Sequence, residues 1–172
     1  ELVARINSRL GGVDEVIQLG LKYRDAKIVR VSECDKHPNA DKLSVCKVDI
    51  GDNELVQVVC GAPNVRAGMW AVWLPPESTV PATFDLEPFV LGARELRGVM
   101  SHGMLASAKE LGIGDEHDGI IDIGESDLPN GVELDPGLSF AKTFGLDDTI
   151  IDIENKMFTH RPDLFGQLGV AR

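Results

Sequence analysis

Three side chains near residue 40 could bind a metal ion. Cys34, His37 and Cys46 carry thiol or imidazole groups, which are common ligands of Zn²⁺. A structural zinc site has four ligands, usually in two close pairs, and this sequence has no second pair. We therefore expect no metal site, and we expect Cys46 and Cys60 to occupy strands as small apolar side chains. Three cysteines without a CxxC also argue against a disulfide framework and fit a reducing compartment.

The segment 37–43 (HPNADKL) contains three side chains that could contact RNA: His37, Asn39 and Lys42. A tight turn is the alternative, because proline, asparagine and aspartate are all turn formers. The sequence allows both roles at once.

A second group of candidate RNA ligands lies further along the chain and consists of Asn64, Arg66, Arg97 and Ser101. Arginine can hold a phosphate through two parallel hydrogen bonds. Arg97 could equally pair with one of the many acidic residues. Ser101 could bind RNA or satisfy a β-bulge.

Two further sets of residues have a structural interpretation. Trp70 and Trp73 could stack on bases, but their spacing places them on opposite faces of a strand, so we expect one in the core and one partly exposed. His160, Arg161 and Asp163 resemble a catalytic cluster, yet Pro162 between them forces a bend. We expect Asp163 to lie near the start of a helix that continues to the last residue.

No catalytic residue is assigned. The sequence lacks the phosphate-binding loop GxxxxGK[ST], a GxGxxG after a strand, and the metalloprotease motif HExxH.

The elements that must position these residues are short. Alternation of apolar and polar residues predicts strands at 26–31, 45–50, 55–60, 69–74, 98–105 and 119–123, with a turn at 51–53 joining the second and third. Two glycines in 98–105 indicate a bulge or a close backbone approach. Ser107 and Glu110 have capping-box spacing, which predicts a helix of about two turns ending at Gly112 or Gly114.

This pattern predicts a mainly β protein with short helices. We expect a five-stranded OB-fold barrel at 22–127, inserted into a small, incomplete α+β domain. Residues 1–21 form its first segment, and residues 128–172 form a linker and a return segment. The return segment contains a helix at 138–144 and a strand at 149–153. We expect the two flanks to pack together, and Val48, Val58, Val72 and Leu105 to lie inside the barrel.

The charge restricts the partners. The net charge is −11, and residues 22–127 contain 11 Lys and Arg against 18 Asp and Glu, which is −7. Nucleic-acid binding usually depends on positive charge, so RNA binding must use a local patch or be weak. No apolar run approaches the length of about 20 residues that spans a bilayer, and no signal-peptide pattern is present. A cytoplasmic protein without membrane contact is expected.

Three strings carry a resemblance to a known family. The segments 37–43, 59–65 (VCGAPNV) and 96–104 (LRGVMSHGM) follow each other as in tRNA-binding OB-folds. Over about residues 23–123 the chain resembles the form of this domain found in the β subunit of bacterial phenylalanyl-tRNA synthetase. The flanks 11–20 and 155–172 resemble the surrounding segments of that subunit.

The resemblance implies a role in an α2β2 ligase that joins phenylalanine to its tRNA with ATP and Mg²⁺. It implies catalytic and editing sites outside this chain, so no cofactor is expected here. The implied partners are the α subunit, a second β subunit and tRNA-Phe, with weak or indirect RNA contact. A freestanding tRNA-binding module and a protein scaffold that does not touch RNA are the alternatives.

Overall fold

The computed structural model describes residues 1–9, 11–51, 55–154, 160 and 162. The chain divides into two compact units. Unit 1 combines Glu1–Leu19 with Asp148–Arg172, and unit 2 is Gly20–Asp147. Within the described residues, no helix is long and apolar enough to cross a membrane.

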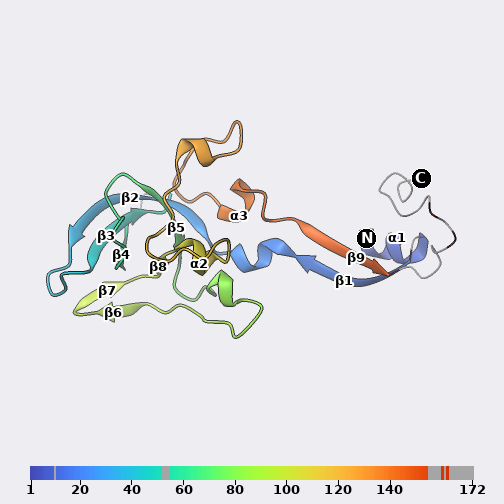
Figure 1. Ribbon diagram of the computed structural model, residues 1–172, viewed down its shortest axis with the longest axis horizontal. Coiled ribbons are helices and arrows are strands. Elements are labelled where there is room, and N and C mark those ends of the chain that lie inside the picture. The colour runs from blue at the N-terminus through green and yellow to red at the C-terminus, as the bar shows by residue number, and fades with distance from the viewer. Residues whose placement is uncertain (10, 52–54, 155–159, 161, 163–172) are drawn as a thin grey trace. The chain divides into compact units, whose positions relative to one another are not determined.

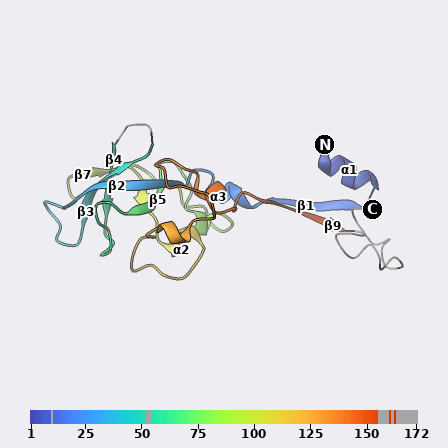
Figure 2. The ribbon, with the colours of Figure 1, turned by 90° about the horizontal axis from the view of Figure 1, so that it is seen from above.

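Unit 1 is built on two strands from opposite ends of the chain. β1 (Gly12–Gln18) pairs antiparallel with β9 (Thr149–Glu154), and helix α1 (Leu2–Arg9) precedes β1. The two strands run side by side in both views (Figures 1 and 2). Each segment alone is a single strand with unpaired backbone groups, so pairing satisfies both. The predicted association of the two flanks is confirmed, as is the strand at 149–153.

Unit 2 contains a five-stranded antiparallel sheet in the order β4-β3-β2-β5-β8. Its strands are β2 (Lys27–Lys36), β3 (Ser44–Asp49), β4 (Leu55–Cys60), β5 (Trp70–Leu74) and β8 (Met104–Leu105). The backbone N–H of His102 donates to Gln57 O on β4 at 2.9 Å, which links the two edges of the sheet. The result is a nearly closed barrel, as expected for an OB-fold.

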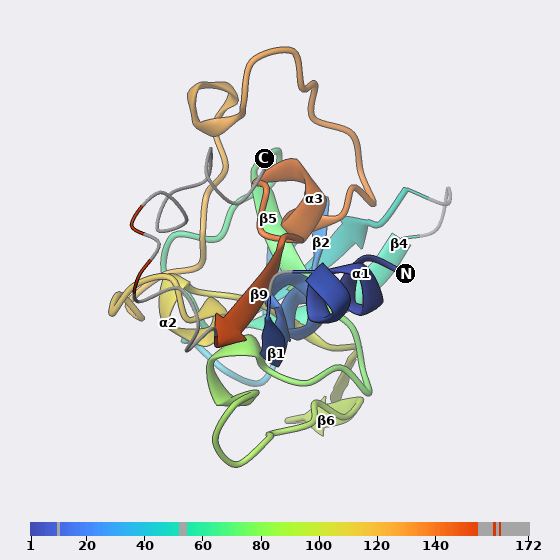
Figure 3. The ribbon, with the colours of Figure 1, turned by 90° about the vertical axis from the view of Figure 1, so that its right-hand side faces the viewer.

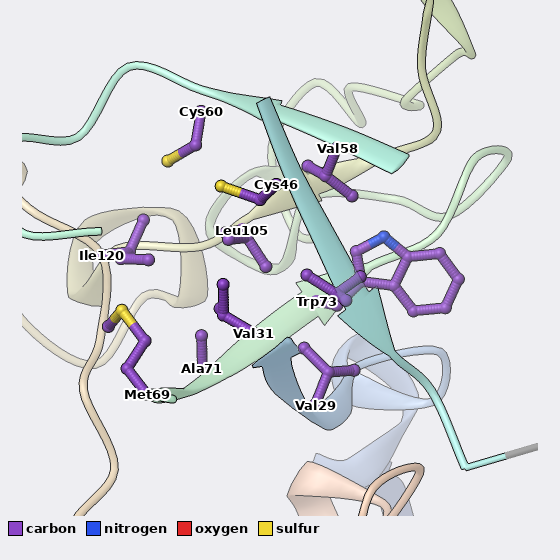
Figure 4. Close-up of a cluster of buried hydrophobic side chains, with 11 residues drawn as sticks. Val29, Val31, Cys46, Val58, Cys60, Met69, Ala71, Trp73, Leu105 and Ile120 are labelled. Carbon is purple, nitrogen blue, oxygen red and sulfur yellow. The ribbon is translucent and has the colours of Figure 1, made fainter. Parts of the chain in front are cut away.

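The barrel interior is filled by one apolar cluster. It combines Val29 and Val31 of β2, Cys46 and Val48 of β3, and residues from the neighbouring strands (Figure 4). Val48, Val58 and Leu105 belong to it, as predicted from strand alternation. Trp73 is 6% exposed and its Nε1 donates to His102 O at 2.9 Å, whereas Trp70 is half-buried. The two tryptophans therefore face opposite sides of β5, as their spacing predicted.

A second cluster lies on the other side of β2 and β5. Ile28 and Val72 pack there with Tyr23 and with Phe140 of α3 (Phe140–Thr143), the helix beside β2 in Figure 3. Val72 is fully buried, but it lies in this second cluster. The prediction that it lies inside the barrel was therefore wrong, because the side chains of β5 alternate between the two clusters.

The boundary of the barrel unit differs from the one drawn at residues 127 and 128. Ile28 N donates to Leu138 O at 2.8 Å, and Phe140 N donates to Ala26 O at 3.0 Å. Together with the burial of Phe140, these bonds attach residues up to Asp147 to unit 2. The predicted helix at 138–144 is shorter than expected, because Ser139 caps it through the Lys142 N–H.

Two predicted strands are corrected. The strand at 98–105 is split into β7 (Val99–Ser101) and β8, because Gly103 has φ +81 and lies against β5. A Cβ there would be 2.1 Å from Leu74 O, so the glycine marks a close backbone approach. Residues 119–123 are not a strand, although Ile121 N and Ile123 N donate to Ala106 O and Trp70 O.

The remaining elements are short. Helix α2 (Ala108–Leu111) has the predicted capping box of Ser107 and Glu110 and ends at Gly112, but it makes one turn rather than two. β6 (Arg94–Leu96) pairs with β7 as a separate hairpin. Short 3₁₀ helices within residues 11–51 and 55–154 are η1 (Leu19–Tyr23), η2 (Pro81–Thr83) and η3 (Glu125–Asp127). The predicted turn at 51–53 lies partly outside the described residues, and the final helix with Arg161 and Asp163 lies wholly outside them.

Candidate nucleic-acid interface

The turn between β2 and β3 is held by the His37 imidazole. His37 is 5% exposed. Its Nδ1 accepts the backbone N–H of Asn39 at 3.0 Å, and its Nε2 lies 3.0 Å from Leu96 O on β6. Because Nδ1 is an acceptor, the ring proton is on Nε2 and is donated to the Leu96 carbonyl. His37 therefore joins the turn to the β6–β7 hairpin and has no ring nitrogen left for a ligand.

The tip of the β6–β7 hairpin lies against the same turn. Leu96 pairs with Val99, so Arg97 and Gly98 form a two-residue turn with φ of +50 and +90. Asn39 Nδ2 donates to Arg97 O at 3.0 Å. This bond uses the backbone carbonyl of Arg97, and the residue is exposed.

We call the surface formed by residues 35–42 and 94–97 the tip surface. Figure 1 shows its two segments at the same end of the barrel. Asn39, Lys42 and Arg97 are all exposed on it. It contains four Lys and Arg against three Asp and Glu, a net charge of +1, whereas the whole of unit 2 carries −9. The tip surface is thus a locally positive region of an acidic unit.

Asn64 and Arg66 lie elsewhere and bind the segment before η3. The side chain of Asn64 accepts Ile120 N–H at 3.0 Å and donates to Ile120 O at 2.8 Å. The Arg66 guanidinium pairs with Asp122 at 2.6 Å on the protein surface. Both contacts attach residues 120–122 to the loop that contains Asn64 and Arg66.

Ser101 is 3% exposed and satisfies backbone groups. Its hydroxyl accepts Val59 N–H and donates to Gly103 O, both at 3.0 Å. This is the bulge role that the sequence allowed. The candidate set is therefore divided. Asn39, Lys42 and Arg97 are exposed on the tip surface, while His37, Asn64 and Ser101 bond to backbone groups and Arg66 pairs with Asp122.

Neither Lys36 nor the exposed apolar residues of the loop before β6 were among the residues predicted from the sequence. Lys36 is exposed directly before His37, and its position beside the motif was the available signal. Leu86, Phe89 and Val90 are 83%, 47% and 54% exposed in the loop that leads to β6. Arg94 lies over the Phe89 ring, with 5.7 Å to its centroid.

The described residues contain no group of three or more His, Cys, Asp or Glu side chains that could hold a metal ion. A hollow of about 580 Å³ beside residues 115–120 is lined by Asn64, Asp115, Glu116, His117 and Asp118. The His117 imidazole lies 3.8 Å from Asp118, and both are exposed to solvent.

Comparisons with known proteins agree with these observations. A family model described as "Putative tRNA binding domain" matches residues 26–133. A phenylalanine–tRNA ligase beta subunit from Rhodopseudomonas palustris is 42% identical over 97% of this chain and 19% of that protein. Its counterpart from Synechococcus sp. strain CC9605 is 42% identical over 93% of this chain and 19% of that protein. The chain thus spans about a fifth of the length of these curated relatives.

Among solved structures, a MetRS-related protein from Pyrococcus horikoshii aligns with a TM-score of 0.43 and 22% identity. The alignment covers 65% of this chain and 84% of that one. A likeness this loose supports no conclusion about function.

Proposed function

The chain belongs to the "Putative tRNA binding domain" family, and we propose that it is a non-catalytic, RNA-associated part of a phenylalanine–tRNA ligase. The beta-subunit relatives match both flanks as well as the barrel. The antiparallel pairing of β1 with β9 supports an inserted domain, because a freestanding module would not need two flanks that complete each other. Aminoacylation of tRNA-Phe in the cytoplasm is the process we assign to the whole assembly.

The tip surface is the site that we assign to RNA. The observation that carries this assignment is its local charge of +1 within a unit of −9. Lys42 and Arg97 are exposed there, and the bonds from His37 and Asn39 hold the two segments in place. A guanidinium on a fixed hairpin can meet a phosphate at little entropic cost.

Binding through this surface is weak. The surrounding acidic residues repel RNA, and only a few cations are available to displace counterions. We expect a dissociation constant weaker than about 10⁻⁴ M at physiological salt, with tighter binding at low salt.

A tRNA titration of the wild type and Arg97→Ala at low and physiological salt tests this proposal. At low salt, Arg97→Ala should weaken binding about tenfold, because a hydrogen bond to a charged group contributes on the order of 1.5 kcal/mol. Arg24→Ala is the matched control. It removes the same charge from an exposed arginine that directly follows η1, pairs with Asp25 and does not belong to the tip surface.

Tight binding that is insensitive to salt contradicts the proposal, as does an equal loss in both variants. No binding at either salt favours the second candidate function, a protein scaffold. The acidity of unit 2 and the exposed Leu86, Phe89 and Val90 favour that alternative.

The partners follow from the same relatives. A subunit designated beta implies an alpha subunit, and we propose that α and a second β subunit complete the ligase. ATP and Mg²⁺ would act in that assembly. We assign catalysis and editing to other regions of that assembly, because this chain spans only about a fifth of the length of its relatives.

A further inference from the structure

Two cysteines face each other across β2 and β3. Cys34 pairs with Cys46 in the register of these strands, and their sulfur atoms are 3.6 Å apart. The Cys46 thiol donates to Cys34 Sγ, and the Cys34 thiol in turn donates to Val65 O at 3.8 Å. A lone pair of Cys34 Sγ is therefore directed at Cys46.

The strand register favours a bond between them. His37 N donates to Leu43 O at 3.0 Å, so residues 37 and 43 form a hydrogen-bonded pair. Pairs alternate along an antiparallel ladder, which makes Cys34 and Cys46, three steps away, a non-hydrogen-bonded pair. Such pairs have Cα atoms about 4.5 Å apart, at the short end of the range that a disulfide spans. A disulfide between these two residues therefore fits the spacing of the two strands.

The two thiols differ in how accessible they are to solvent. Cys34 is half-buried and Cys46 is fully buried. Burial, reinforced by the neighbouring Cys34, raises the pKa of the Cys46 thiol, so this thiol stays protonated at neutral pH. Cys34 is consequently the thiol that a small oxidant meets first. Cys46 is already in place to react with the product.

From this geometry we propose that Cys34 and Cys46 form a reversible redox pair, oxidised by peroxides to a cross-strand disulfide. Cys34 sulfur attacks one peroxide oxygen, the O–O bond breaks, and a sulfenic acid and one water form. Cys46 sulfur then attacks Cys34 sulfur. The S–O bond breaks, the Cys46 proton joins the departing hydroxide, and a second water leaves. Two thiols lose two electrons and one hydrogen peroxide gains them.

The third cysteine is not part of this pair. Figure 4 shows Cys60 on a strand beside Cys46, with its sulfur in the same interior. Cys60 Sγ accepts the backbone N–H of Ala62 at 3.4 Å, whereas Cys46 Sγ contacts Cys34.

The disulfide would close the segment 34–46, which contains the turn of the tip surface. The inference does not depend on RNA binding.

The 172-residue chain treated with hydrogen peroxide provides the test. We expect a mass loss of about 2 Da, protection of two of the three thiols from alkylation after unfolding, and a peptide that links residues 34 and 46. A thiol reductant should restore all three thiols. Cys60→Ser is the matched control and should keep the link, whereas Cys34→Ser and Cys46→Ser should abolish it.

A link between Cys46 and Cys60 overturns the proposal, as does stepwise oxygen addition to Cys34 without a link, or three free thiols after treatment. If a serine variant fails to fold, the peptide map of the wild type alone decides.

Discussion

At the residue scale, His37 shows how a side chain suited to ligand binding is used within the fold. Its two ring nitrogens bind Asn39 N–H and Leu96 O, which belong to the two segments of the tip surface. The Nδ1 atom must carry no hydrogen to accept a hydrogen bond. The exposed residues of the tip surface are thus held by a residue that is itself buried.

Replacement of His37 by alanine should lower the free energy of unfolding by about 1–3 kcal/mol, because two backbone groups lose their partner. Urea denaturation measures the change. His102→Ala is the control, since that side chain is exposed and His102 bonds only through its backbone. Variants that agree within about 0.5 kcal/mol would show that the His37 bonds contribute nothing.

Part of this site could be predicted from the sequence. The string 37–43 allowed a turn and RNA contacts through His37, Asn39 and Lys42. The structure shows the turn, with Asn39 and Lys42 exposed and His37 buried, and RNA contact stays a prediction. The role of Asn64 was not predictable, because its partner Ile120 is 56 residues away and only the fold brings them together. The same holds for Arg66 and Asp122.

At the element scale, the barrel strands differ in how far local pattern determines them. β3 and β4 alternate cleanly and were located within one residue of their ends. The strand predicted at 98–105 was wrong as a single element, because Gly103 must approach Leu74 closely. That requirement comes from a strand 30 residues earlier, and no local pattern reports it.

Gly103→Ala should destabilise the protein by at least about 2 kcal/mol, because a Cβ would lie 2.1 Å from Leu74 O and φ is positive. Gly68→Ala is a matched control. Gly68 has φ +86 but no atom within 4 Å of its Cβ position. It should therefore lose only about 1 kcal/mol, from backbone strain. Thermal unfolding of both variants measures the difference, and equal losses would rule out the close approach.

At the scale of the whole molecule, unit 2 includes residues 128–147, which the sequence assigned to a linker and to the start of the return segment. Gly- and Pro-rich composition suggested a linker at 128–136, but Phe140 beyond it packs edge-to-face on Tyr23 at 5.6 Å. Composition describes how a segment behaves by itself. Composition does not show that Phe140, which follows the segment, is buried in the core.

A chain of residues 20–147 should therefore fold cooperatively, whereas residues 22–127 should not. The shorter chain lacks Phe140 and its backbone bonds, and loss of a buried phenylalanine side chain costs about 3–5 kcal/mol. Circular dichroism during heating compares the two. A sharp transition of similar midpoint in the shorter chain would show that residues 128–147 are dispensable.

The ends of unit 2 meet. A Cβ on Gly20 would be only 2.8 Å from Asp147 Cα. In an unfolded chain, bringing residues so distant in sequence together costs about 4 kcal/mol of loop-closure entropy. When unit 2 folds, the burial of its own core offsets that cost. The residues that connect to β1 and β9 are then already close together. Pairing of the strands then becomes a local event, so unit 1 is expected to fold second and quickly, despite having the most distant contacts in the sequence.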